Sequence, residues 1–254
     1  MTSAHTTDNP STVIVTGAHG AIGAALVQRL SVDGYEVLAL DKTTHANSTC
    51  RSAVFDVTSA DAHTEIEANL YGMPPVRALI NAAGILRVGT LTTTTDDDWN
   101  EQFLANAFGV FNVTRAVTNI MIEQQKNDPT NTRSIVTVSS NASSVPRAHM
   151  AVYAASKAAA TAFTKSAGLE LAEHGIRANV ISPGTTRSPM LDQFENSNIH
   201  QQAITGNLTH HKIGIPLKRI AEPQDVAATA SFLISPQARH LTLQDIRVDG
   251  GASL

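Results

Sequence analysis

The chain is poor in cysteine and in aromatic residues and has no long hydrophobic run, and each shortage excludes a class of protein. A single cysteine, Cys50, rules out an intrachain disulfide and a metal–thiolate cluster. No stretch approaches the roughly 20 consecutive apolar residues of a membrane-spanning helix. None of the 10 histidines forms a metal-binding spacing with another histidine or with the cysteine. We therefore expect a protein without a disulfide, a metal or a membrane span.

A surplus of basic residues is also missing. The 18 Lys and Arg residues are outnumbered by 22 Asp and Glu residues, which gives a net charge of −4, and no basic cluster is interleaved with aromatics. This balance argues against nucleic acids and anionic membranes as partners. Residues 1–11 are polar and lack both an apolar run and a basic leader. We therefore expect a disordered tail there rather than a signal peptide, and a cytoplasmic protein.

Hydrophobic residues make up 42% of the 254 residues but aromatic residues only 4%, so the expected core consists of Ala, Val, Ile and Leu. Short apolar runs alternate with helical patterns along residues 12–254, which predicts one α/β domain with a Rossmann-like doubly wound parallel sheet and helices on both faces. The expected strands are 12–16, 36–40, 53–55, 76–80, 134–138, 177–182 and 246–248. The longer helices are expected at 22–30, 99–124, 153–173 and 222–235. The polar stretch 185–215 is the candidate substrate lid.

A glycine-rich turn joins the first expected strand to the first helix. Glycine allows a tight turn and a close approach of the backbone to a pyrophosphate, and the N–H groups at a helix start favour an anion. Taken alone such a turn is weak evidence, since many of them only connect two elements. The candidate cofactor-binding residues in this turn are Gly17, His19, Gly20, Ala21, Ile22 and Gly23.

The ends of the next strands also favour a nucleotide. Asp41 can accept both ribose hydroxyls of an adenosine and would repel a 2′-phosphate, so NAD is expected over NADP, although Lys42 follows immediately. Asp56 and Val57 are positioned to meet the adenine ring; alternatively, Asp56 is a cap or turn residue. The fourth strand ends in residues that suit a backbone packed closely against a ligand, namely Asn81, Ala82 and Gly84.

Tyr153 and Lys157 stand one helical turn apart on the same face of an Ala-rich helical segment. A tyrosine ordinarily titrates near ~10, and a nearby cation favours the phenolate. Lys157 and a positively charged nicotinamide could together lower the pKa of Tyr153 by ~3 units, which corresponds to about 4 kcal/mol. We expect the pair to act as a base, although a Tyr and a Lys at this spacing are, taken alone, more often a surface pair.

Six features follow one another along the chain: Thr16-Gly17 with Gly23, Asn81-Ala82-Ala83-Gly84, Asn106, Ser140, Tyr153 with Lys157, and Pro183-Gly184. In their order and spacing the chain from Thr12 onward resembles the short-chain dehydrogenase/reductases. The resemblance implies a Rossmann-type oxidoreductase with a nicotinamide cofactor. One departure is Ala21, where the family usually has glycine; its methyl group is tolerable if the backbone keeps a negative φ.

The resemblance implies a role for each matched residue. Tyr153 would accept the hydroxyl proton, and Lys157 would bind the nicotinamide ribose and lower the pKa of Tyr153. Ser140 would hydrogen-bond the reacting oxygen, and Asn106 would hold a proton-relay water. Further cofactor contacts are implied for Pro183, Gly184, Thr186 and Ser188. The family likeness also implies a homotetramer, for which the Ala-rich helix offers a packing face.

Three stretches, 81–89, 214–218 and 240–251, resemble one branch of the family, in which Leu243 likewise replaces a common glycine. The implied reaction is that of catecholate siderophore biosynthesis: NAD oxidises one hydroxyl of a cyclohexadiene diol carboxylate, and the ketone tautomerises to a catechol. A carboxylate substrate requires a cation, for which Arg87 and Arg147 are the candidates, unless they are solvated loop arginines. Met190 is a candidate for the apolar side of the pocket or for the core.

Two other functions stay open. A different short-chain dehydrogenase/reductase, such as a ketone or 3-oxoacyl reductase, would share the catalytic set and differ in its substrate loops, although Asp41 argues against an NADPH enzyme. A non-catalytic dinucleotide-sensing protein could use the same fold. The intact set of Asn106, Ser140, Tyr153 and Lys157 argues against the second alternative.

Overall fold

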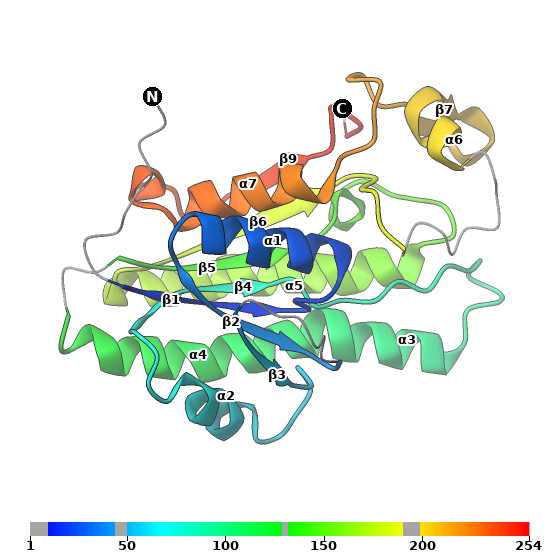
Figure 1. The fold of residues 1–254 in the computed structure, drawn as a ribbon. Helices are drawn as coiled ribbons and strands as arrows, with labels where there is room; N and C mark the ends of the chain where they lie inside the picture. Colours follow the sequence, from blue (N-terminus) through cyan, green and yellow to red (C-terminus); the bar gives the residue numbers. More distant parts are fainter. Residues whose placement is uncertain (1–9, 44–49, 129–131, 190–198, 254) are drawn as a thin grey trace.

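Seven parallel strands form one twisted sheet at the centre of the molecule (Figure 1). The structure is a computed structural model that describes residues 10–43, 50–128, 132–189 and 199–253. The strand order is β3-β2-β1-β4-β5-β6-β9, so the chain reverses its direction of travel across the sheet between β1 and β4. The strands are β1 (Thr12–Thr16), β2 (Glu36–Asp41), β3 (Arg51–Val54), β4 (Val76–Asn81), β5 (Arg133–Val138), β6 (Ile176–Pro183) and β9 (Asp245–Val248). This topology confirms the predicted doubly wound sheet.

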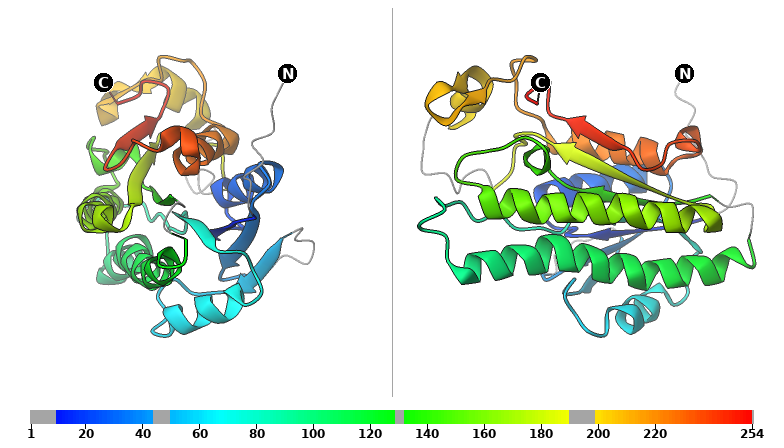
Figure 2. Two further views of the ribbon diagram at one scale, coloured as in Figure 1. Left: turned by 90° about the vertical axis from the view of Figure 1, so that its left-hand side faces the viewer. Right: turned by 180° about the vertical axis from the view of Figure 1, so that it is seen from behind.

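Helices cover both faces of the sheet, as the end-on view in Figure 2 shows. The helices α1 and α7 pack on one face, and α2, α4 and α5 lie on the other. Their bounds are α1 (Ala21–Val32), α2 (Ala62–Leu70), α3 (Asp96–Phe103), α4 (Gly109–Gln125), α5 (Ala151–Leu171), α6 (Ile199–Thr205) and α7 (Pro223–Ile234). The central strands β1, β4, β5 and β6 are buried along their whole length and are rich in Val, Ile, Leu and Ala, because both of their faces are covered.

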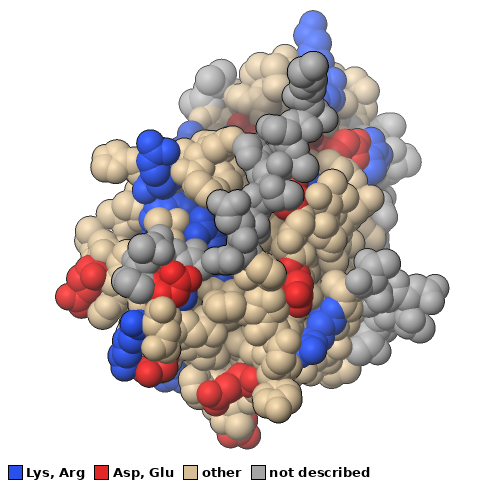
Figure 3. Space-filling view, turned by 60° about the vertical axis from the view of Figure 1, so that its left-hand side comes forward, with Lys and Arg blue, Asp and Glu red and all other residues tan. Residues whose placement is uncertain are grey.

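Two apolar clusters hold these layers together. Leu26 and Leu30 of α1 pack with Leu233 of α7 on one face, and Val117 and Met121 of α4 belong to the cluster on the other. All five side chains are fully buried. On the face shown in Figure 3, acidic and basic side chains lie at several separate places among uncharged residues. No described helix is long and apolar enough to cross a membrane.

The long helix expected at 99–124 is divided into three parts. Thr95 begins α3 with a capping box, in which its hydroxyl accepts a hydrogen bond from the Asp98 N–H. A π-helical turn, Leu104–Phe108, then separates α3 from α4. Such a turn adds a residue to the helical repeat and is frequent at functional sites. It carries Asn106, which is completely buried.

Other differences concern the ends of elements. The third strand is Arg51–Val54 rather than 53–55. The disordered tail was predicted to reach residue 11, which is too far. Ser11 is buried, and its carbonyl accepts a hydrogen bond from the Glu36 N–H. Residues 1–9 lie outside the described residues. The stretch 185–215 contains α6 and also a small hairpin of β7 (Gly206–Asn207) and β8 (Lys212–Ile213).

Candidate active site

Tyr153 and Lys157 lie in the first two turns of α5, beside the carboxyl end of β5. Their spacing brings both side chains to the same side of the helix. Lys157 is only 5% exposed, and Tyr153 lines a cavity. The pair is therefore part of an interior site, and the alternative of a surface pair is excluded.

Ser140 lies two residues beyond the end of β5, within reach of Tyr153. Both side chains line the same cavity, and the Ser140 hydroxyl lowers the pKa of the Tyr153 phenol. The Ser140 hydroxyl also accepts a hydrogen bond from the Ala142 N–H at 3.2 Å. The preceding Ser139 has a different role, since its hydroxyl donates to the Lys157 carbonyl and contacts the Thr161 hydroxyl. The structure thus brings Ser140, and not Ser139, to the phenol.

Burial dominates the electrostatics of Tyr153 and Lys157. Burial raises the pKa of Tyr153, and the hydrogen bond from Ser140 lowers it without cancelling the effect of burial. Burial also lowers the pKa of Lys157 to about 8. Lys157 is not among the groups that shift the pKa of Tyr153 in the structure, and the lowering of this pKa by Lys157 and a nicotinamide together stays a prediction. The Lys157 ammonium donates instead to the Val138 carbonyl at 2.9 Å.

Asn106 secures the segment that follows β4. Its side-chain oxygen accepts from the Ile85 N–H at 2.8 Å, and its amide donates to the Ile85 carbonyl at 2.9 Å and to the Ser156 hydroxyl at 3.0 Å. A Cβ added to Gly84 would lie 2.9 Å from this oxygen and 3.0 Å from the Lys157 ammonium. A side chain at position 84 would therefore require these two polar groups to shift. A proton-relay water held by Asn106 stays a prediction.

The turn between β1 and α1 fits a dinucleotide. Gly17 has a φ of +64°, and a Cβ there would approach the Ala83 backbone to 2.6 Å. A Cβ on Gly23 would overlap the Gly17 carbonyl oxygen. The turn can therefore be this tight only because both positions are glycine. It places the N-terminal N–H groups of α1 at the carboxyl end of the sheet, where they can bind an anion. Ala21 begins α1 and is not among the residues with positive φ, so its methyl group is tolerated.

Asp41 ends β2 directly beside this turn. Its carboxylate accepts hydrogen bonds from the His19 N–H at 3.0 Å and from the Thr43 N–H at 3.3 Å. The following Lys42 pairs with Asp56 at 3.1 Å. Asp41 is therefore the acid nearest the turn, and the charge of Lys42 is already matched by another carboxylate.

The remaining candidates of the nucleotide side have structural contacts of their own. Asp56 accepts from the N–H and the hydroxyl of Thr58 at 2.9 and 2.8 Å, which is the turn role left open by the sequence. Val57 is buried against Gly109. The Asn81 amide donates to the Thr114 hydroxyl, and the Ala82 N–H to the Thr16 hydroxyl. Contacts of these residues with adenine or ribose stay predictions.

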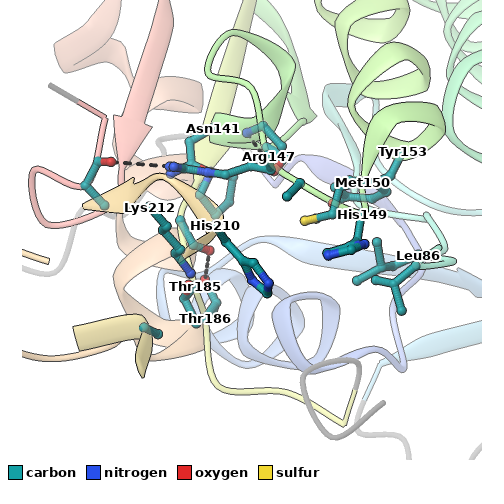
Figure 4. A pocket seen from close by; sticks show the side chains of 18 of the residues that line it. Leu86, Asn141, Arg147, His149, Met150, Tyr153, Thr185, Thr186, His210 and Lys212 are labelled. Carbon is teal, nitrogen blue, oxygen red and sulfur yellow. Dashed lines mark hydrogen bonds between the residues drawn. The ribbon is translucent and has the colours of Figure 1, made fainter. Parts of the chain in front are cut away.

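A cavity of about 870 Å³ opens at the carboxyl ends of β5 and β6 (Figure 4). This is where ligands bind in doubly wound sheets. The predicted residues that line it are Ile22, Ser140, Arg147, Tyr153, Pro183, Gly184, Thr186 and Ser188. Arg87 does not line it, and its guanidinium pairs with Glu101 at 3.1 Å. Met190 lies outside the described residues.

Several residues of the cavity were missed by sequence reasoning. His149 and Met150 precede α5, and Gln202, Asn207, His210 and Lys212 come from the stretch 199–213. The rings of His149 and His210 meet edge to face, with centroids 5.1 Å apart. His149 adopts a φ of 63°, unusual for a non-glycine residue. No spacing in the sequence relates these two segments, because only the tertiary fold brings them together.

The chain is similar to known dehydrogenases over almost its whole length. Residues 11–198 match the family described as short chain dehydrogenase. The 2,3-dihydro-2,3-dihydroxybenzoate dehydrogenase of Bacillus subtilis is 40% identical over 253 residues, covering 94% of this chain and 95% of the relative. The enzyme of the same name from Escherichia coli is 39% identical over 245 residues, covering 95% and 96% respectively.

A solved structure agrees with the architecture. The 3-ketoacyl-(acyl-carrier-protein) reductase from Brucella melitensis, complexed with NADH, matches with a TM-score of 0.83 and 25% identity, over 96% of this chain and 98% of that one. Its likeness extends from the first strand to the last. The chain therefore belongs to the short-chain dehydrogenase/reductase family.

Proposed function

We propose that this protein oxidises 2,3-dihydro-2,3-dihydroxybenzoate to 2,3-dihydroxybenzoate with NAD, a step of catecholate siderophore biosynthesis. The observation that carries the proposal is that Ser140 and Tyr153 face a cavity that also contains Arg147. An acid–base pair beside a guanidinium suits an alcohol that carries a carboxylate. The two relatives of about 40% identity act, by their names, on this substrate.

The cofactor is assigned to the side of the site that bears Asp41. The glycines of the turn would receive the pyrophosphate, Asp41 the adenosine ribose, and Lys157 the nicotinamide ribose. NAD, when bound, supplies the hydride acceptor and a positively charged nicotinamide ring. The carboxylate of Asp41 disfavours the 2′-phosphate of NADP.

The chain's own residues manage the proton. Tyr153, as phenolate, takes the proton of the C3 hydroxyl while the carbon loses its hydride. Ser140 donates a hydrogen bond to the reacting oxygen and so stabilises the negative charge that develops there. Lys157, with its buried charge, favours the phenolate over the phenol. The resulting ketone loses a ring proton and gains one on oxygen, which gives the aromatic catechol.

Arg147 is proposed to bind the substrate carboxylate. It is half-buried in the cavity wall, and its Nη2 donates to the Ala252 carbonyl at 3.2 Å, which restrains the guanidinium. A restrained guanidinium can bind a carboxylate with two parallel hydrogen bonds. Arg87 is given up as the second candidate because of its pairing with Glu101.

We further propose a cytoplasmic homotetramer with residues 185–215 as the substrate lid. Leu169 on α5 is 67% exposed, and Phe108, next to α4, is 41% exposed. These apolar side chains support a subunit interface along the two helices. A monomeric mass in sedimentation would refute it. A single thiol, Cys50, suits a reducing compartment.

Identification of the product tests the proposed function. Purified protein is incubated with NAD and the diol carboxylate, and the products are separated by chromatography. We expect one catechol to form for each NADH. If no catechol forms while simpler cyclic alcohols are oxidised, the reaction is that of another member of the family. If NAD binds but no alcohol is oxidised, the protein is a dinucleotide sensor.

A further inference from the structure

Lys212 brings a second strong cation to the cavity that contains Arg147. It begins β8 and faces Asn207 of β7 in the small hairpin. Both Asn207 and Lys212 line the cavity, and Lys212 is half-buried there. No carboxylate of the described residues pairs with the Lys212 ammonium. Its charge is thus available to a ligand.

The cavity wall has no acidic side chain among its described residues. Two cations, Arg147 and Lys212, and two histidines, His149 and His210, line the same space. The nearby Asp249 does not pair with Arg147; its carboxylate accepts hydrogen bonds from the Asn141 amide at 3.3 Å and the Gly251 N–H at 3.0 Å. Among the described residues, the cavity wall therefore carries more positive than negative charge, and Asp249, which lies outside the wall, is the acid whose charge acts on Arg147.

The two cations are close enough to disfavour each other. Burial lowers the pKa of Lys212, and the charge of Arg147 lowers it further. Burial also lowers the pKa of Arg147. Like charges in a partly desolvated site are costly unless an anion lies between them. A bound carboxylate would relieve this repulsion, and so the pair of cations favours an anionic ligand.

The cations come from two different parts of the chain. Arg147 belongs to the loop between β5 and α5, and Lys212 to the hairpin. The edge-to-face contact of His149 with His210 joins the same two segments. In the view of Figure 4, Arg147 and Lys212 lie toward one side of the cavity and Tyr153 toward the other. This arrangement separates an anion-binding side from the reacting side.

We infer that Lys212 is the specificity-determining residue that, together with Arg147, selects ring substrates with a carboxylate over neutral ring alcohols. The inference deepens the proposed function and rests on it for the identity of the substrate. The chemistry it requires is only a monocarboxylate on a six-membered ring. Benzoate is therefore a sufficient probe, and benzamide is its neutral counterpart of nearly the same shape.

Binding to the NAD-saturated enzyme, measured by calorimetry, tests the inference. We expect the native protein to bind benzoate more tightly than benzamide. Lys212→Met keeps the length of the side chain but removes its charge, and it should weaken benzoate binding by roughly 10-fold, as expected for a charged hydrogen bond, with benzamide binding unchanged. Lys212→Arg should retain most of the affinity for benzoate. Lys218→Met is the matched control, because Lys218 is an exposed lysine of the same region outside this cavity.

Unchanged benzoate binding in Lys212→Met would overturn the inference. An equal loss of benzoate and benzamide binding would also overturn it, since Lys212 would then only shape the cavity. The inference would likewise be overturned if the native protein bound benzoate no more tightly than benzamide. Failure to oxidise the diol carboxylate would instead refute the proposed function, and the binding experiment would still decide the role of Lys212.

Discussion

Ser140 and Tyr153 line the same cavity at the carboxyl end of the sheet, where the Ser140 hydroxyl lowers the pKa of the Tyr153 phenol. Ser140 follows β5 and Tyr153 lies in the first turn of α5, thirteen residues later. The connecting loop also carries Arg147, so one short stretch of chain supplies the proposed base, the proposed hydrogen-bond donor and a cation of the cavity. The carboxyl end of β5 thus determines how these three side chains lie relative to one another.

The hydrogen bond from Ser140 should be visible in the pH dependence of catalysis. It lowers the pKa of Tyr153, so Ser140→Ala should move the rise of kcat/KM with pH to higher pH. The same variant should lose roughly 10²-fold in kcat, since a donor to the developing charge is removed. Ser143→Ala is the control, because Ser143 does not line the cavity. An unchanged pH profile in Ser140→Ala would contradict the assigned contact.

Asp41 should control the choice of cofactor. Asp41→Ala removes the carboxylate beside the turn, and adding Asp56→Asn frees Lys42 from its 3.1 Å ion pair. We expect the double variant to raise the ratio of kcat/KM for NADP to that for NAD by about 10²-fold, because a repelling charge is lost and an attracting one is gained. Asp61→Asn, an exposed acid after β3, serves as control. If the double variant had the same ratio as the native protein, Asp41 would not contact the cofactor.

The two glycines at the start of α1 should respond differently to alanine. A Cβ on Gly23 overlaps the Gly17 carbonyl, whereas a Cβ on Gly20 lies 3.4 Å from it, and Gly20 has a φ of −67°. Gly23→Ala should therefore lower the free energy of unfolding by about 2 kcal/mol, or Tm by roughly 4–8 °C. Gly20→Ala should leave Tm of the cofactor-free protein nearly unchanged. Equal Tm values for the two variants would show that the turn is less tight than described.

The buried charge of Lys157 should make stability depend on pH. Burial lowers its pKa from 10.5 to about 8. Above that pKa the unfolded chain holds a proton that the folded chain has lost, so the contribution of this group to stability rises with pH. The full penalty is present at lower pH, and it corresponds to roughly 3 kcal/mol.

Lys157→Met isolates this contribution. Urea unfolding of both proteins from about pH 7 to about pH 10 should show the native protein gaining about 2–3 kcal/mol relative to the variant. Measuring both proteins in a Tyr153→Phe background removes the titration of Tyr153 from the comparison. Parallel pH dependences would mean that Lys157 is not desolvated.

Local patterns predicted much of the fold, and the family resemblance named the candidate catalytic residues. The strands and helices were predicted from the spacing of apolar residues along the chain. Ser140 follows the end of β5, and Tyr153 and Lys157 lie near the beginning of α5. Their convergence follows from the rule that parallel strands end at one edge. The π-helical turn around Asn106 was not predicted, because it adds a single residue within one long helical pattern.

The substrate side could not be predicted in the same way. Arg87 was a reasonable candidate from its position after β4, but Glu101 of α3, fourteen residues away, pairs with it. Lys212 and His210 reach the cavity only because the hairpin folds over the loop before α5. Likewise the pKa of Tyr153 depends on its burial, which spacing alone does not reveal.

The most direct test of the account is NADH formation from the diol carboxylate by the native protein and by Tyr153→Phe, followed by absorbance, with NAD binding measured on both. The account predicts rapid NADH formation by the native protein and a loss of at least about 10³-fold in the variant, which removes the proton acceptor but not the cofactor site. NAD affinity should be largely retained. A variant that still turns over at a comparable rate would contradict the role of Tyr153 as the base.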